Sequence, residues 1–313
     1  GTSFHSGMMS LHYFKEVSNF NCVQLFDGAE FENKDIPRNG KTGIILISQS
    51  GETKDLHRCV KIAQNNDLFM IGVVNVVDSL IAREVHCGCY LNAGREVAVA
   101  STKAFTSQSI LLSMIAMWFA QQKNIHQFKR EKMIKDLRKL HMDIKTTIEI
   151  CENQIEDILP LFDDQNHCFI LGKGLGESVA KEGALKIKEI SYVHAEGYST
   201  SSLKHGPFAL LEKDFPVILL APEDDYYDKS MNAYEEIKSR YATVITITDN
   251  KLCEKQHSIK IPLNETFRHL LKMKHFYKIS FSQIAYEVTG PIPTIINQKF
   301  IPISMKIIYW LLI

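Results

Sequence analysis

The chain has 313 residues, of which 45% are hydrophobic and 23% are charged, as expected for a folded globular protein with one large domain or two ordinary ones. Its 36 basic residues balance 36 acidic ones, which argues against the net field that recruits nucleic acid or an anionic membrane. The seven cysteines form no metal-like double pair, so we expect reduced thiols in a cytoplasmic protein without a bound metal.

The first part of the sequence alternates apolar strands with helices. It starts at Gly1-Thr2-Ser3 with no methionine or leader peptide, so we interpret the chain as a fragment that begins inside a fold, with its first strand truncated. The alternation is typical of a parallel sheet with right-handed crossovers. In chain order we expect a polar loop over 1–7, a helix over 8–17, a strand over 44–47, a helix over 55–63, strands over 68–75 and 85–91, and a helix from about 101 to 122.

A cluster of hydroxyl and amide side chains follows the strand over 44–47, which we expect to be buried on both faces. Where this strand turns into the next helix, the helix N-terminus offers partial positive charge and unpaired N–H groups, which suit a phosphate. Capping of the helix is the alternative, but one such residue satisfies a cap, so the cluster favours a phosphate site. Its members are Ser48, Gln49, Ser50, Gly51 and Thr53.

The same strand and helix pattern restarts after a polar segment over 127–160, which predicts a pair of linking helices. The second series has a strand over 168–171, a glycine loop over 172–176, a helix from Glu177, a strand over 215–220, a helix over 226–241 and a strand over 243–248. We therefore expect an α/β fold of two duplicated, doubly wound, flavodoxin-like parallel-sheet lobes. The turn over 221–225 carries carboxylates, so only the first lobe is expected to hold phosphate. The expected limits are 1–125 for the first lobe, 126–160 for the linking helices, 161–290 for the second lobe and 291–313 for a C-terminal tail.

Charged residues lie on one face of the helix that follows the second glycine loop. Glu182, Lys186 and Glu189 recur at i, i+4 and i+7. From spacing alone a solvated row of salt bridges is the ordinary explanation, but ligands of such sheets bind near the start of this helix. A carboxylate beside an ammonium group there could act as a proton shuttle. Farther along, His205 lies next to a Gly-Pro turn and is either a catalytic or an ordinary surface residue.

Together these segments resemble the isomerase half of the glucosamine-6-phosphate synthase family, whose members are tandem sugar-isomerase (SIS) proteins. The resemblance implies isomerisation of fructose 6-phosphate on the way to glucosamine 6-phosphate, without a cofactor. Six short runs in the family's order carry it: Gly1-Thr2-Ser3, Ser48 to Thr53, Asn92-Ala93-Gly94, Val99 to Thr106, Glu182 to Ser191 and Leu203 to Pro207.

The resemblance also implies roles for individual residues. Glu189 carries the proton between C1 and C2 with Lys186 beside it, and His205 assists ring opening from the neighbouring subunit of a homodimer. The implied phosphate-binding residues are Ser3, Ser48, Gln49, Ser50 and Thr53, with Thr2 as a further substrate-binding residue, and the implied sugar pocket includes Val99 and Ser101. From the residues alone, the alternative for Ser101 and Thr102 is capping of the following helix, which either residue would satisfy.

Three departures from the family pattern bear on function. The family enzyme has an N-terminal glutaminase domain, so we expect the missing ammonia supply to come from such a partner. The family's Schiff-base lysine has no match, since Lys299 and Lys306 lie outside its motif, and Ser202 replaces a usual glutamate. Two other functions stay open: a sugar-phosphate binding module without turnover, and another SIS enzyme such as a deaminase or deglycase of amino-sugar phosphates.

Overall fold

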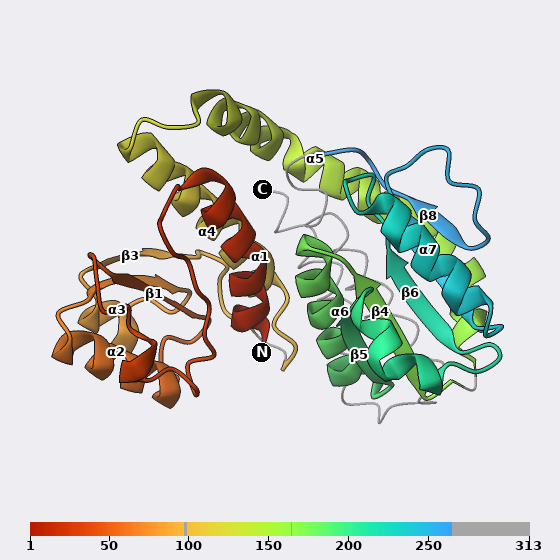
Figure 1. Cartoon of the computed structure of the whole chain (residues 1–313), viewed down its shortest axis with the longest axis horizontal. Helices are drawn as coiled ribbons and strands as arrows, with labels where there is room; N and C mark the ends of the chain where they lie inside the picture. The colour runs from red at the N-terminus through yellow and green to blue at the C-terminus, as the bar shows by residue number, and fades with distance from the viewer. Residues whose placement is uncertain (97–98, 164, 265–313) are drawn as a thin grey trace. The chain divides into compact units, whose positions relative to one another are not determined.

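The computed structural model describes residues 1–96, 99–163 and 165–264. The chain divides between Arg130 and Glu131 into two compact units, each built around its own parallel sheet (Figure 1). The predicted α/β class with two sheet-based lobes is confirmed. The expected lobe limits at 125, 161 and 290 stay predictions, and the tail over 291–313 lies outside the described residues.

The first unit contains a three-stranded parallel sheet. Its elements in chain order are α1 (Thr2–Val17), a 3₁₀ turn (Asn33–Asp35), β1 (Gly43–Ser48), α2 (Lys54–Asn65), β2 (Phe69–Val74), α3 (Leu80–Glu84), β3 (Cys87–Tyr90) and α4 (Lys103–Gln122). The strand order is β1-β2-β3, and the core under α2 includes Leu46, Val60 and Met70. α1 packs against α4 (Figure 1).

The start of α1 differs from the expectation. Residues 1–7 were predicted to form a polar loop, but the helix begins at Thr2. Ser6 and Gly7 are buried in it: the Ser6 hydroxyl bonds to Gln108 of α4, and Gly7 packs close to Ile47 of β1. Small residues let a helix approach its neighbours closely, so a stretch that looks polar in the sequence lies at a packed interface.

The strand β1 is also less buried than predicted. Leu46 and Ser48 are buried, whereas Ile44, Ile45 and Ile47 are only partly so. β1 stands at one edge of the three-stranded sheet, and an edge strand has a neighbour on only one side. A continuous apolar run therefore did not indicate burial on both faces.

A single long helix replaces the predicted pair of linking helices. α5 runs from Gln127 to Ile158 and is followed by a 3₁₀ turn (Leu159–Phe162). No glycine or proline interrupts it before Pro160, so nothing in the sequence breaks the helix. Its buried residues include Met133, Leu140 and Ile144, which form one stripe at helical spacing.

The second unit contains a five-stranded parallel sheet in the order β5-β4-β6-β7-β8, which is the flavodoxin-like order. Its elements are β4 (His167–Gly172), α6 (Leu175–Ser191), β5 (His194–Ser199), η3 (Ser202–His205), η4 (Pro207–Leu210), β6 (Pro216–Leu220), α7 (Tyr227–Lys238), β7 (Thr243–Thr248) and β8 (Ser258–Lys260). α6 packs against β4 and β5, and α7 against β6 and β7, on opposite faces as right-handed crossovers require (Figure 1).

The sequence analysis missed β5 and β8. β5 contains His194, Glu196 and Gly197, residue types that are uncommon in strands, and it lies at the edge of the sheet. Gly197 is needed there because a Cβ atom would lie 2.5 Å from the Ala180 carbonyl of α6. The close approach of helix and strand, rather than strand propensity, stabilises this element.

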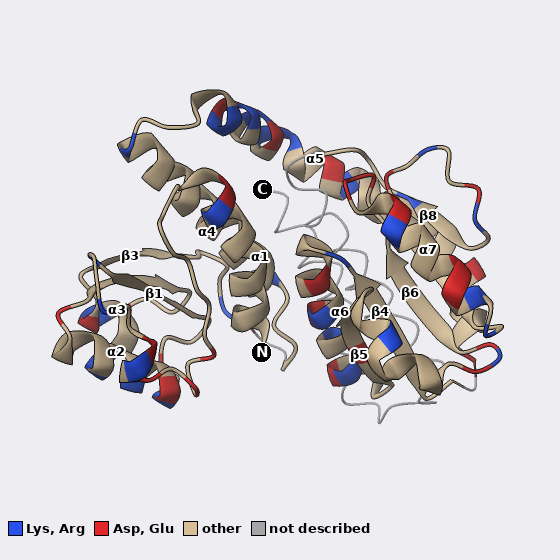
Figure 2. Ribbon diagram, in the orientation of Figure 1, with Lys and Arg blue, Asp and Glu red and all other residues tan. Residues whose placement is uncertain are grey.

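Acidic and basic side chains are interspersed over the elements of both units, as the balanced composition suggests (Figure 2). None of the helices in the described ranges is both long and apolar enough to cross a bilayer.

Candidate functional site

The turn between β1 and α2 holds the predicted phosphate cluster in one loop of the first unit. Gly51 has a φ of +69°, and a Cβ atom there would collide with the hydroxyl of Ser79. Only glycine therefore fits at the centre of this turn. Ser48 is 3% exposed and ends β1, so the cluster begins inside the core and opens toward the start of α2.

Two serine hydroxyls of this turn accept backbone hydrogen bonds. The Gly51 N–H donates to Ser48 Oγ at 2.9 Å, and the Glu52 N–H donates to Ser50 Oγ at 3.2 Å. A hydroxyl that accepts in this way keeps its own proton for donation to a ligand. Thr53 is the N-cap residue of α2, but its side chain makes no capping hydrogen bond. Helix capping therefore does not account for the cluster.

Ser3 is positioned by a residue that the sequence analysis missed. Gln108 of α4 is fully buried, its Nε2 donates to Ser3 Oγ at 3.0 Å, and its Oε1 accepts from the Ser6 hydroxyl at 2.9 Å. Thr2 is the first residue of α1, the helix that also contains Ser3. Gln108 shares the buried face of α4 with the polar residues Thr106, Ser109 and Ser113, so its residue type did not set it apart in the sequence.

Ser101 has a buried hydroxyl that finds no hydrogen-bond partner among the described residues. It precedes α4, where Thr102 is the N-cap residue and has no side-chain capping bond either. An unpaired buried hydroxyl costs free energy, and a ligand that bonds to it would remove that cost. Val99, the other predicted sugar-pocket residue, is 93% exposed.

Asn75 holds the loop that leads toward Ser101. Its Oδ1 accepts from the Ala93 N–H at 3.0 Å, and its Nδ2 donates to the Gly94 carbonyl at 2.7 Å. Asn75 directly follows β2, so it ties the end of that strand to the Asn92-Ala93-Gly94 segment. The sequence analysis noted the segment but did not assign a role to Asn75.

The charged face of α6 is buried and not solvated. Lys186 is 0% exposed and Glu182 is 1% exposed, so the ordinary explanation from spacing, a solvated salt-bridge row, is wrong. Lys186 Nζ lies 2.5 Å from Glu189 Oε2 and 3.6 Å from Glu182 Oε1. The Glu189 side chain is 24% exposed, so it is the member of this trio that a ligand can reach.

The backbone ahead of α6 requires glycine. A Cβ atom on Gly172 would collide with the Gly176 carbonyl, and Gly174 has a φ of +57°. This tight loop starts α6 immediately after β4. The carboxyl ends of parallel strands are where such sheets bind ligands, so the start of α6 lies at that edge.

His205 ends η3 in the same unit and is exposed. The turn is anchored by Leu203, which is 0% exposed, and Gly206 follows with a φ of +136°. No hydrogen bond or ion pair joins His205 to Lys186 or Glu189 within the described residues. The structure thus pairs Lys186 with Glu189, whereas His205 joins them through neither kind of contact in the part of the chain that is described.

Metal ligands do not gather among the described residues of either unit. No group of three or more histidine, cysteine, aspartate or glutamate side chains in the described ranges could hold a metal ion. The predicted site residues form two sets, one in the first unit at the start of α1 and before α2 and α4, and one on α6 and η3 of the second.

The sequence is similar to known proteins over most of its length. A family model described as the SIS domain matches residues 1–118 and 161–267. A probable glutamine–fructose-6-phosphate aminotransferase (isomerizing) of Acanthamoeba polyphaga mimivirus is 48% identical over 274 residues, which cover 87% of this chain and 45% of the relative. The aminotransferase of that name from Chlorobaculum tepidum is 39% identical over 247 residues, which cover 79% of this chain and 40% of the relative. The chain thus spans somewhat less than half the length of these relatives.

Solved structures share the architecture. The C-terminal domain of glucosamine-fructose-6-phosphate aminotransferase from Francisella tularensis matches with a TM-score of 0.78 and 27% identity, over 89% of this chain and 80% of that chain. Tagatose-6-phosphate ketose/aldose isomerase from Escherichia coli matches with a TM-score of 0.70 and 16% identity, over 94% of this chain and 81% of that chain, a likeness of fold alone.

Proposed function

Because this chain belongs to the SIS-domain family, we propose that it is the isomerase part of a glutamine–fructose-6-phosphate aminotransferase. The proposed substrate is fructose 6-phosphate and the product of the full reaction is glucosamine 6-phosphate, a step of hexosamine biosynthesis toward UDP-N-acetylglucosamine. The proposed location is the cytoplasm. The observation that carries the proposal is the buried pairing of Lys186 with Glu189 on α6.

The proton transfer rests on this pair. In the ketose-to-aldose direction, the Glu189 carboxylate removes a proton from C1, and the electron pair of the C–H bond forms an enediol with the carbonyl at C2. The same carboxyl group then returns the proton to C2, while the hydroxyl proton on O1 moves to O2. Lys186 orients the Glu189 carboxylate at 2.5 Å and offsets the negative charge that develops beside it.

The phosphate group is assigned to the β1–α2 turn. Ser48, Ser50 and Thr53 offer hydroxyl donors there, and Gln49 adds an amide. The N-terminus of α2 contributes partial positive charge to the same loop. Ser3 and Thr2 at the start of α1, with Ser101 and Val99 before α4, complete the proposed substrate-binding set of the first unit.

The oligomer and the ammonia source belong to the same proposal. His205 is exposed and is assigned to ring opening in the site of a neighbouring subunit, which makes the active form a homodimer. The ammonia that replaces the ketose oxygen is assigned to a glutaminase partner domain. Neither assignment needs a metal or another cofactor.

Isomerisation of fructose 6-phosphate to glucose 6-phosphate tests the proposal without ammonia. The chain should interconvert the two sugars, and Glu189→Gln should lower kcat by about 10² to 10⁴-fold with little change in KM. Glu177→Gln is the matched control, because Glu177 lies on the same helix and likewise pairs with a lysine, Lys181. A wild-type rate no greater than that of Glu189→Gln would overturn the assignment.

A further inference from the structure

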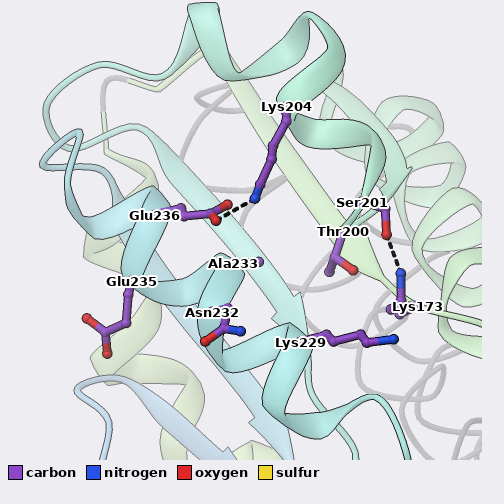
Figure 3. Close-up of a pocket in the computed structure, with 9 residues that line it drawn as sticks. All are labelled: Lys173, Thr200, Ser201, Lys204, Lys229, Asn232, Ala233, Glu235 and Glu236. Carbon is purple, nitrogen blue, oxygen red and sulfur yellow. Dashed lines mark hydrogen bonds and ion pairs between the residues drawn. The ribbon is translucent and has the colours of Figure 1, made fainter.

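A polar pocket lies within the second unit. Its volume is about 480 Å³, large enough for a phosphorylated sugar. Figure 3 shows three lysines and three uncharged polar side chains around it: Lys173, Lys204, Lys229, Thr200, Ser201 and Asn232.

The pocket lies at the carboxyl ends of β4 and β5. Lys173 follows β4 directly, and Thr200 and Ser201 follow β5. The Thr200 N–H donates to the Gly172 carbonyl at 3.0 Å, so the two strand ends lie side by side. Ligands of open parallel sheets bind outside this edge, which gives the pocket the right place in the fold.

The carboxylates of the pocket are already neutralised. Glu236 lies 2.6 Å from Lys204 Nζ, and Glu235 lies 2.6 Å from Lys255 Nζ (the first pair is drawn in Figure 3). Lys173 and Lys229 have no carboxylate partner within the residues that the structure describes. The pocket therefore has an excess of positive charge.

These two lysines converge on one aromatic ring. Lys173 Nζ is 5.7 Å and Lys229 Nζ is 5.8 Å from the centroid of the Tyr226 ring. The ring is held against Gly174, where an added Cβ would approach it to 3.0 Å. Lys173 also donates to Ser201 Oγ (Figure 3). Both ammonium groups therefore lie near the same ring, and an anion bound to them would offset their positive charge.

We propose that this pocket binds the phosphate group of a small phosphorylated metabolite, as an anion site separate from the one in the first unit. Lys173 and Lys229 supply the charge, and the hydroxyls of Thr200 and Ser201 supply further donors. Ser201 directly precedes η3, and Lys204 lies within it next to its last residue, His205. The bound anion therefore holds the turn that presents His205. Binding itself does not depend on the isomerase proposal.

The sequence analysis expected phosphate only in the first lobe, because the turn over 221–225 carries carboxylates. That comparison considered the loop after β6, whereas the pocket lies beside the loop after β5. Its lysines come from three separate segments, and no short motif contains them.

Isothermal titration with inorganic phosphate and with fructose 6-phosphate tests the proposal. The background is the double variant Ser50→Ala with Thr53→Ala, which removes the candidate site of the first unit, and it should retain one saturable site. Adding Lys173→Met and Lys229→Met should weaken that site about tenfold or more. The matched control, Lys213→Met with Lys251→Met, changes the charge equally at exposed positions of the same unit and should leave affinity within about twofold.

The conservative pair Lys173→Arg with Lys229→Arg should keep binding, which separates loss of charge from misfolding. The proposal is overturned if the background variant shows no saturable binding, or if the methionine pair binds as well as its control. A failure of the first-unit site would appear differently, as equal binding by the wild-type chain and the background variant, and the remaining isotherm would still support the second site.

Discussion

Lys186 and Glu189 of α6 form an ion pair at 2.5 Å in which the lysine is fully shielded from solvent. Glu182, one turn earlier, is 3.6 Å from the same ammonium group and is also buried. The Lys186 ammonium group thus lies within ion-pair distance of two carboxylates, of which Glu182 is buried and Glu189 is 24% exposed. Removal of the ammonium group would take an ion-pair partner from the buried Glu182 carboxylate, and loss of such a partner is costly.

Replacing Lys186 with methionine should therefore destabilise the chain by about 3 to 5 kcal/mol. The carboxylate of Glu182 would remain buried without this ammonium group. Chemical denaturation measures the change, and Lys181→Met on the same helix is the control. The Lys181–Glu177 pair is partly exposed, so the control should lose less than about 1 kcal/mol. Equal losses in the two variants would contradict the buried-pair interpretation.

Gly51→Ala should damage the phosphate turn more than an ordinary glycine replacement does. Gly40 is the matched control, because its φ is +87° but an added Cβ would meet no atom within 4 Å. We expect Gly40→Ala to cost about 1 to 2 kcal/mol from backbone strain. Gly51→Ala should cost about 1 to 3 kcal/mol more, because its Cβ would also collide with Ser79. Thermal unfolding of the two variants measures the difference in stability, and equal melting temperatures would contradict the tight packing of Gly51 against Ser79.

Gln108→Met should lower both stability and affinity for fructose 6-phosphate. The variant removes the partner of the Ser3 and Ser6 hydroxyls at a buried position, which should cost about 1 to 3 kcal/mol. Gln121→Met on the exposed side of the same helix should change stability by about 0.5 kcal/mol or less. If Gln108→Met keeps the wild-type affinity for the sugar phosphate, Ser3 does not need Gln108 to bind it.

Alkaline pH should destabilise the chain through Cys168. Burial raises the pKa of this thiol to about 12, above the ordinary value of an exposed cysteine. The folded state then keeps a proton that the unfolded state loses, so stability is full below about pH 9 and falls by up to about 1.4 kcal/mol per pH unit above it.

Denaturation at pH 8 and pH 10.5 measures this slope. Cys168→Ala should flatten it, whereas Cys22→Ala at an exposed position should leave it unchanged. A Cys168→Ala variant with the wild-type slope would assign the alkaline loss to other groups.

Short-range patterns predicted much of the candidate site. The turn from Ser48 to Thr53 is contiguous, so the residues that follow one strand necessarily meet in one loop. The spacing of Glu182, Lys186 and Glu189 likewise placed them on one face of a helix, and the ion pair confirms that placement. Both inferences needed only local geometry.

Contacts between distant segments decided the rest. Whether the charged face of α6 meets water depends on what packs over it, so spacing could not distinguish a solvated row from a buried pair. Gln108 acts on Ser3 from a position 105 residues away, and the lysines around the pocket of the second unit come from the loop after β4, from η3 and from α7. The sequence by itself determined the alternation of strands and helices, because that alternation follows from the period of apolar residues. Burial and convergence of side chains were decided only by tertiary structure, because both depend on neighbours that the local sequence does not contain.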